Sequence, residues 1–84
     1  MDIKYKLKKD IVSRTASMLA WNINEIAKDS NIRIIYNGNV FNAKSLIGIL
    51  HNHIMCGEEI KITIEDLSIV EDIKEIFNVI AEEI

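Results

Sequence analysis

The chain has 84 residues, a formal net charge of −3, one cysteine and no proline. A chain of this length forms a single domain, here residues 1–84, and one cysteine excludes the internal disulfides of small secreted scaffolds. Its hydrophobic and charged fractions, 49% and 27%, are those of a folded protein. No apolar run approaches about 18 residues and no apolar segment follows the N-terminus. Neither a membrane span nor a signal peptide is therefore expected, and the protein is predicted to be cytoplasmic.

Charge is distributed unevenly along the chain. Five of the ten basic residues lie within the first 14 positions, whereas nine acidic residues and two lysines lie in the stretch from Glu58 onward. The total is acidic, and no basic stripe interleaves with aromatic residues. We expect a dipolar surface and no binding of nucleic acid.

Hydrophobic periodicity predicts three elements in the first half of the chain. Apolar residues alternate with lysines over residues 3–8, which is typical of a half-buried strand. Ser13 is a candidate N-cap for a helix over about 14–28, whose apolar residues follow at helical spacing. Residues 32–36 are rich in β-branched side chains and predict a second strand.

The second half begins with a hairpin signal and ends with an amphipathic helix. Asn37-Gly38 predicts a tight turn into a third strand over about 39–43. A short helix capped by Ser45 follows, and then a fourth strand over 60–65. Ser68 and Glu71 have the spacing of a capping box, and the last helix is predicted to continue to Ile84.

The element order β-α-β-β-α-β-α places four strands against three helices. Strands that alternate apolar and polar residues bury one face and leave the other in solvent. The predicted fold is therefore an α+β, two-layer sandwich with a mainly antiparallel sheet and all helices on one face.

The start of the first helix is a candidate anion site. Arg14 stands in the first turn, where the helix dipole disfavours a cation by up to about 1 kcal/mol. The placement makes sense if the guanidinium and the free N–H groups at Ser13 and Arg14 hold an anion together. The alternative is that Arg14 turns toward Asp10 or solvent.

Ser45 is the second candidate, first as a helix cap and second as a phosphorylation site. A phosphate there would lie at free backbone N–H groups beside Lys44. The short helix that follows carries Leu46, Ile47, Ile49 and Leu50, which one helix face cannot bury together. We expect at least one of them to be exposed, as in a docking surface, the alternative being a helix lying flat on the core.

The two histidines carry no recognisable site. His51, His53 and Cys56 lie within six residues, a spacing that matches no structural zinc pattern. No catalytic triad and no phosphate-binding glycine loop can be identified. We expect no metal, no cofactor and no enzymatic activity.

Two segments carry a family resemblance. Residues 11–17, Ile-Val-Ser-Arg-Thr-Ala-Ser, resemble the histidine phosphorylation signature of HPr, the histidine-containing phosphocarrier of the bacterial sugar phosphotransferase system. That signature reads Leu-His-Ala-Arg-Pro-Ala-Ser/Thr. Residues 42–50, Asn-Ala-Lys-Ser-Leu-Ile-Gly-Ile-Leu, resemble the family's second signature, which contains a regulatory serine. The resemblance covers nearly the whole chain and implies the HPr-like open-faced sandwich of the same element order.

The departures from the family pattern bear on function. Val12 stands where the family has its phosphorylated histidine, and valine has no nucleophile. Thr15 replaces the usual proline, and His53 replaces the glycine at the end of the second helix. The loop after the first helix is about two residues longer. Arg14, Ser45 and the apolar residues after Ser45 are retained.

The resemblance therefore implies a regulatory protein similar to catabolite-repression HPr-like proteins, which lack the histidine and keep the serine. An HPr kinase would phosphorylate Ser45, and a catabolite-control transcription regulator would bind the surface formed by Leu46, Ile47 and Leu50. Enzyme I of the system is not an expected partner. Two alternatives stay open: an interaction module that is never phosphorylated, and a residual phosphocarrier that uses another residue. The chain is expected to be a monomer or a weak homodimer.

Overall fold

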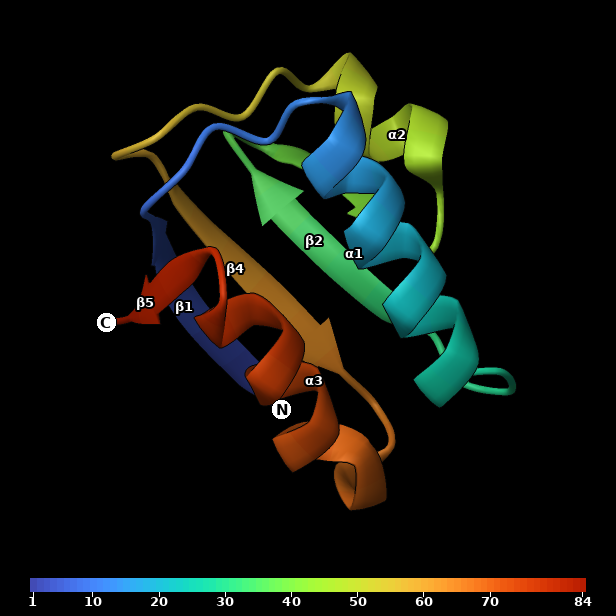
Figure 1. The fold of residues 1–84 in the computed structure, drawn as a ribbon. Coiled ribbons are helices and arrows are strands. Elements are labelled where there is room, and N and C mark those ends of the chain that lie inside the picture. Colours follow the sequence, from blue (N-terminus) through green and yellow to red (C-terminus); the bar gives the residue numbers. More distant parts are fainter.

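The computed structural model describes residues 1–84 as one sheet covered by helices on one face (Figure 1). The strand order is β3-β2-β4-β1-β5, and every neighbouring pair is antiparallel. The elements in chain order are β1 (Asp2–Leu7), α1 (Ser13–Ile26), β2 (Ile32–Tyr36), β3 (Asn39–Asn42), α2 (Leu46–His51), β4 (Glu59–Ile64), a 3₁₀ turn (Leu67–Ile69), α3 (Val70–Asn78) and β5 (Ala81–Glu83). The predicted α+β open-faced sandwich is confirmed.

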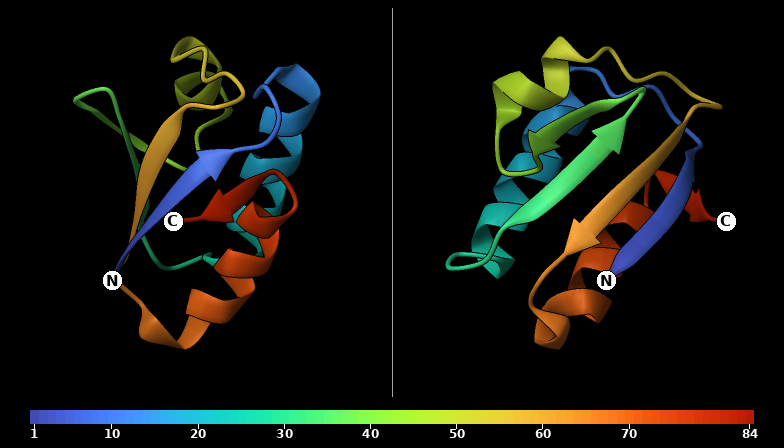
Figure 2. Two further views of the ribbon diagram at one scale, coloured as in Figure 1. Left: turned by 90° about the vertical axis from the view of Figure 1, so that its left-hand side faces the viewer. Right: turned by 180° about the vertical axis from the view of Figure 1, so that it is seen from behind.

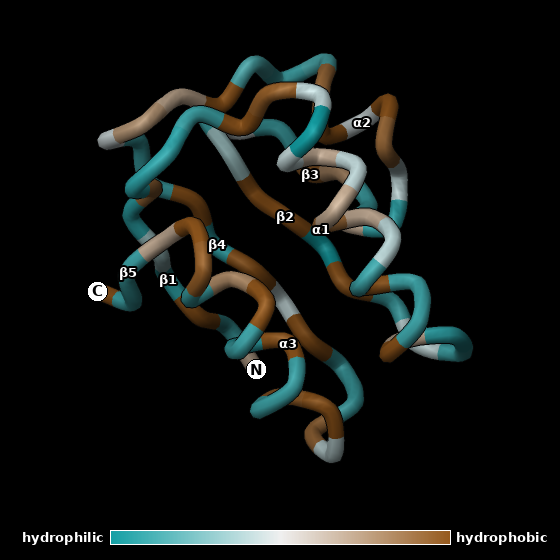
Figure 3. Tube along the Cα trace, in the orientation of Figure 1, coloured by the Kyte–Doolittle hydropathy of each residue, from teal (hydrophilic) through white to brown (hydrophobic).

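Strand alternation fixes which side chains form the core. In β1 and β4 every second residue is buried, and Ile3 pairs with Ile62 across the two strands. The intervening side chains, such as Lys4 and Lys61, point to the open face. Figure 3 shows this alternation as changing hydropathy along the strands, and Figure 2 shows the helices gathered on one side of the sheet. The core consists only of apolar residues and Tyr5, whose ring stacks on Phe77 of α3.

The hairpin between β2 and β3 is confirmed at the predicted turn. Asn37 and Gly38 both have positive φ, 51° and 83°, as the two central residues of a type I′ turn require. Tyr36 pairs with Asn39 directly across the turn. The turn therefore fixes the register that places Ile34 opposite Phe41 on the covered face.

The end of the chain differs from the sequence prediction, because the sheet has a fifth strand. α3 ends at Asn78 instead of continuing to Ile84, and β5 pairs with β1 so that Ala81 lies opposite Leu7. The Lys8 N–H donates to the Ile80 carbonyl oxygen at 2.7 Å, and the Ile84 N–H donates to that of Lys4 at 3.0 Å. A continued helix would leave these polar groups on the edge of β1 without partners, so strand pairing prevails over the helical period.

Two predicted helix caps are also wrong. α1 begins one residue early, at Ser13, and its N-cap is Val12, which makes no side-chain cap. The predicted capping box of Ser68 and Glu71 does not form. Asp66 instead accepts hydrogen bonds from the Ser68 hydroxyl and N–H, and these bonds lower the pKa of that carboxyl. Ser68 thus becomes part of the 3₁₀ turn that precedes α3.

Every helix of the structure is too short or too polar to cross a lipid bilayer.

Candidate functional site

The start of α1 presents an exposed N-cap followed by free backbone donors. Val12 is extended, with φ −95° and ψ 178°, and is 55% exposed. Its carbonyl oxygen accepts from the Ala16 N–H, while the N–H groups of Ser13, Arg14 and Thr15 have no partner. These groups carry the positive end of the helix dipole. The electrostatics of this helix start therefore favour an anion, but the exposed side chain beside it, that of Val12, is an alkyl group.

Arg14 makes neither a hydrogen bond nor an ion pair in the structure. Its alternative partner, Asp10, instead accepts from the Cys56 N–H at 2.7 Å. The guanidinium is thus exposed and available at the helix start. Without an imidazole at position 12, the helix start lacks the side chain that would accept a phosphoryl group there.

Ser45 is the N-cap of α2, and its cap geometry is confirmed. Its hydroxyl oxygen accepts from the Gly48 N–H at 3.1 Å, and its carbonyl oxygen accepts from the Ile49 N–H at 3.0 Å. A Cβ at position 48 would lie 3.2 Å from the Ser45 hydroxyl oxygen. Gly48 is therefore the residue that leaves room for this half-buried cap.

Two hydrogen bonds tie the approach to Ser45 to α1 and to the segment that follows this helix. The Asn24 amide donates to the Lys44 carbonyl oxygen at 3.1 Å, and the Lys44 ammonium donates to the Lys28 carbonyl oxygen at 3.3 Å. Ser45 thus lies beside the second half of α1, whereas α2 ends near the start of that helix (Figure 1).

Both α1 and α2 carry exposed apolar side chains. Ile47 is 79% exposed and Leu46 38%, while Ile49 is buried and Leu50 is half-buried against the core. The expectation that one helix face cannot bury all four is confirmed. Trp21, at 68% exposure, and Leu46 line a groove of about 470 Å³ between α1 and α2. We call Met18, Trp21, Leu46 and Ile47 the α1–α2 patch.

Sequence reasoning missed the contribution of α1 to this patch. Met18 and Trp21 follow Arg14 at spacings of four and seven residues, so all three lie on the helix face opposite the buried Leu19 and Ile23. The signal was present as two large apolar side chains outside the apolar stripe. Trp21 and Leu46 line one groove, and exposed apolar side chains gathered in this way are of the kind that marks protein contacts.

The histidines follow the end of α2, and the backbone after His53 lies beside the approach to α1, because the Ile11 N–H donates to the Ile54 carbonyl oxygen at 2.8 Å. His51 is the last residue of α2, and His53 follows with a positive φ of 49°. That left-handed conformation is the one glycine usually supplies after a helix, so His53 adopts the backbone of the residue it replaces. Cys56 is exposed on the next loop, and no three His, Cys, Asp or Glu side chains come together as metal ligands would.

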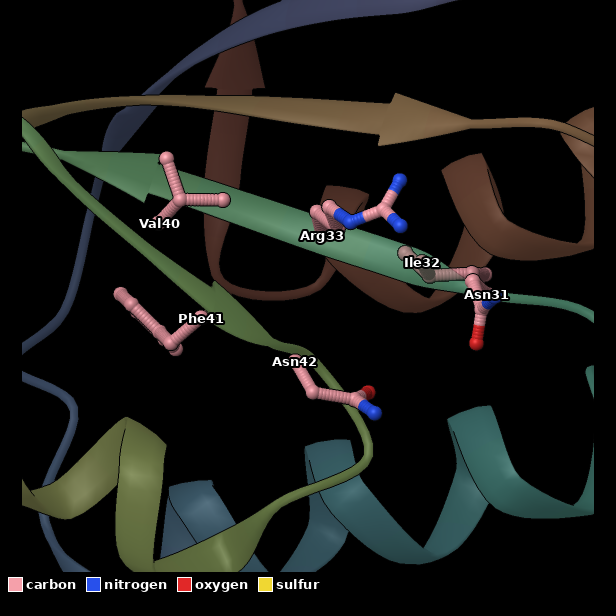
Figure 4. Close-up of a pocket in the computed structure, with 6 residues that line it drawn as sticks. All are labelled: Asn31, Ile32, Arg33, Val40, Phe41 and Asn42. Atoms are coloured by element: carbon pink, nitrogen blue, oxygen red, sulfur yellow. The ribbon is translucent and has the colours of Figure 1, made fainter.

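A second hollow, of about 180 Å³, lies at the β2–β3 pair (Figure 4). Its polar groups come from Asn31, Arg33 and Asn42. The Arg33 guanidinium forms an ion pair with the Glu65 carboxylate at 2.9 Å. Since the hollow carries no nucleophile and no general base, we assign it no chemistry.

The fold defines a class, namely open-faced α+β sandwiches whose helices cover one face of an antiparallel sheet. The family model described as "PTS HPr component phosphorylation site" matches residues 2–82. The chain therefore belongs to the HPr family, the phosphocarriers of the phosphotransferase system, which interact with other proteins of that system. No curated protein sequence matches it significantly.

Solved HPr structures share the fold over nearly the whole chain. A phosphocarrier protein HPr from Bacillus anthracis is 26% identical with a TM-score of 0.77, covering 95% of this chain and 93% of its own. HPr-C-His from Thermoanaerobacter tengcongensis is 25% identical with a TM-score of 0.75, covering 95% and 88%. The histidine-containing phosphocarrier protein of Mycoplasma is 28% identical with a TM-score of 0.72, covering 93% and 86%.

Proposed function

We propose that this protein is a regulatory member of the HPr family that acts in carbon catabolite control through phosphorylation of Ser45. The observation that carries the proposal is the valine at the N-cap of α1. Val12 occupies the position of the family's phosphorylated histidine and offers no lone pair for a phosphoryl group. The chain thus keeps the fold and the neighbouring Arg14 without the acceptor.

The surroundings of Ser45 suit a phosphoserine. A phosphate on its hydroxyl would lie at the start of α2, where the N–H groups of Leu46 and Ile47 have no backbone partner and the Gly48 N–H already points at the hydroxyl oxygen. Negative charge at a helix N-terminus is favourable by about 0.3–1 kcal/mol. Phosphorylation would therefore add charge beside the apolar side chains of Leu46 and Ile47 without breaking the helix.

The apolar surface provides the contact for the partner. Leu46, Ile47 and Leu50 form one part of it, and Trp21 extends it onto α1. An HPr kinase that modifies Ser45 and a catabolite-control transcription regulator that reads the phosphoserine are the partners this role requires. The protein itself is a binding protein of one domain, residues 1–84, which works in the cytoplasm as a monomer or weak dimer, without a cofactor and without catalysis.

The proposal is tested with HPr kinase and ATP, read by intact mass. The wild type should gain the mass of one phosphate, and Ser45→Ala should gain none. Ser13→Ala is the matched control, because it removes another serine from the first turn of a helix and should still be modified. An unmodified wild type, or an equal gain in Ser45→Ala, contradicts the proposal.

A second candidate is an HPr-fold interaction module that needs no phosphorylation, and the exposed Trp21 favours it, because the patch is already accessible beside an unmodified serine. If this candidate is correct, Trp21→Ala should weaken the binding of a partner protein. Ser45→Ala and Ser45→Asp should leave that binding unchanged. A residual phosphocarrier is distinguished by incubation with enzyme I and radiolabelled phosphoenolpyruvate, in which any label on the wild type would support it.

A further inference from the structure

A groove of about 340 Å³ separates the outer faces of α1 and α3, the two helices that lie side by side over the sheet in Figures 1 and 2. It lies on a different part of the helical layer from the groove between α1 and α2 and shares with that groove only Glu25. Three apolar and three acidic side chains give the groove its chemical character: Ile26, Ile76, Val79, Glu25, Asp72 and Glu75.

The floor of the groove is apolar. Ile26 of α1 and Ile76 of α3 are half-buried and pack against the core with one side while the other faces the groove. Val79, which caps the C-terminal end of α3, is 55% exposed. A partner that covered these side chains would remove apolar surface from water, which is worth about 25 cal/mol per Å².

The rim of the groove is acidic and has no cation. Glu25, Asp72 and Glu75 are exposed, and none takes part in an ion pair. The ion pairs of the chain are Arg33–Glu65, Lys61–Asp2 and Lys74–Glu83. Asp72 and Glu75 are three residues apart on one face of α3, so their charges repel.

Two of these carboxylates stand where the helices disfavour them. Glu25 lies in the last turn of α1 and Glu75 in the last turn of α3, and neither last turn contains a basic residue. The negative end of each helix dipole makes an anion there unfavourable. Asp72, in the first turn of α3, is explained by the dipole alone, whereas Glu25 and Glu75 have no such local compensation.

We propose that the α1–α3 groove binds a cationic, amphipathic peptide segment of a partner protein. Its apolar side chains cover Ile26, Ile76 and Val79, and its Lys or Arg side chains neutralise Glu25, Glu75 and Asp72. This site is independent of Ser45 and of the α1–α2 patch.

The most basic strand of a second copy of the chain does not supply the occupant. The most basic segment of the chain, which includes Lys4 and Lys6, belongs to β1 and presents its lysines on the open face. The apolar residues of β1 are buried in its own core. A second copy therefore cannot offer cations and apolar side chains together from this strand.

The test uses isothermal titration calorimetry with a synthetic peptide of lysines and leucines arranged at helical spacing. The wild type should bind it, and the triple variant Glu25→Gln/Asp72→Asn/Glu75→Gln should bind it about tenfold more weakly, because the three exposed ion pairs that are lost each contribute modestly and a tenfold loss corresponds to about 1.4 kcal/mol in total. The matched control is Asp2→Asn/Glu59→Gln/Glu82→Gln, which changes the net charge equally but on the open face of the sheet. It should leave the affinity nearly unchanged.

Two further measurements separate the groove from simple charge attraction. Val79→Ser keeps the charge and should weaken binding several-fold, because it removes apolar floor. Oligolysine, which has no apolar side chains, should bind much more weakly than the amphipathic peptide. Unfolding of the acidic triple variant should require as much denaturant as that of the wild type, or more, which excludes misfolding as the cause of weaker binding.

Three results would overturn the proposal. The first is no heat of binding with the wild type. The second is an equal loss in both triple variants or equal binding of oligolysine, either of which assigns the effect to net charge. The third is concentration-dependent dimerisation in sedimentation velocity that only the acidic triple variant abolishes, which makes a second copy the occupant.

Discussion

The side-chain amide of Asn24 joins α1 to the residue that precedes Ser45, donating to the Ala20 carbonyl oxygen at 2.7 Å and to the Lys44 carbonyl oxygen at 3.1 Å. The second bond crosses between segments far apart in the chain. One polar residue on α1 thereby holds the start of α2 in place, which connects the stability of the fold to the position of Ser45.

Replacing Asn24 by Ala should lower the free energy of unfolding by about 1 kcal/mol, the usual net contribution of such a hydrogen bond. Urea denaturation followed by circular dichroism measures it. Asn31→Ala is the control, because Asn31 is exposed and makes no side-chain hydrogen bond. Equal stability of the two variants would show that the Lys44 contact does not hold α2.

Gly48→Ala should destabilise the protein although alanine is the better helix former by about 1 kcal/mol. The new Cβ would lie 3.2 Å from the Ser45 hydroxyl oxygen and 3.3 Å from its Cβ, and the serine cannot withdraw without losing its cap. A double-mutant cycle with Ser45→Gly, measured by urea denaturation, tests whether the contact with Ser45 is the cause. In that background the obstruction is gone, so Gly48→Ala should become stabilising; a loss of stability in both backgrounds would implicate Phe41 instead.

The buried Tyr5 hydroxyl should cause a loss of stability at high pH. Burial, with smaller contributions from Glu83 and Glu71, raises the pKa of its hydroxyl to about 12 from 10.0. The unfolded chain therefore releases the proton at lower pH than the folded one, and the stability that neutral Tyr5 contributes is lost as the pH rises from about 10 to 12. The hydroxyl is buried without a hydrogen-bond partner, so Tyr5→Phe should already gain about 1 kcal/mol at neutral pH.

Denaturant titrations of the wild type and Tyr5→Phe between pH 9 and 12 check this prediction. The stability difference between the two proteins should widen with pH, which separates Tyr5 from the lysines that titrate in both. A constant difference would mean that Tyr5 ionises equally in the folded and unfolded states.

Val12→His should let the start of α1 accept a phosphoryl group from enzyme I and phosphoenolpyruvate. The free N–H groups and Arg14 are already in place, so the imidazole is the missing part. Acid-labile radiolabel on Val12→His and none on the wild type is the expected result. Val12→Asn tests whether a polar side chain alone suffices, and it should stay unlabelled. An unlabelled Val12→His would mean that Thr15 or another departure also prevents transfer.

Much of this fold follows from local sequence signals that the tertiary structure leaves unchanged. The alternation in β1 and β4 matches their buried faces, and Asn37-Gly38 forms the turn its φ preferences require. The Ser45 cap also forms as expected, because its hydroxyl and the Gly48 N–H are neighbours along the chain. Each of these signals acts within a few residues or at the period of one strand.

The errors arise where a distant segment, or a nearer partner than the expected one, takes the hydrogen bonds. Ile80 fits the helical period of α3, but the edge of β1 offers hydrogen bonds that a helix cannot satisfy, so the chain leaves the helix and forms β5. Ser68 and Glu71 have the spacing of a capping box, yet Asp66 is nearer and takes the Ser68 hydroxyl and N–H. The exposure of Trp21 is not evident from its neighbours in sequence, because most of them are buried. It follows from the position of Trp21 on the helix face opposite the core.

β1 pairs only with β4 and β5, residues 59–64 and 81–83. During synthesis the first strand therefore has no partner strand until β4 has left the ribosome, and Ile3, Tyr5 and Leu7 stay unprotected until then. Native contacts of such large sequence separation form slowly, because the loop must close before they stabilise anything. The most hydrophobic strand face near the N-terminus is thus the part of this protein with the longest exposure to aggregation and to chaperones.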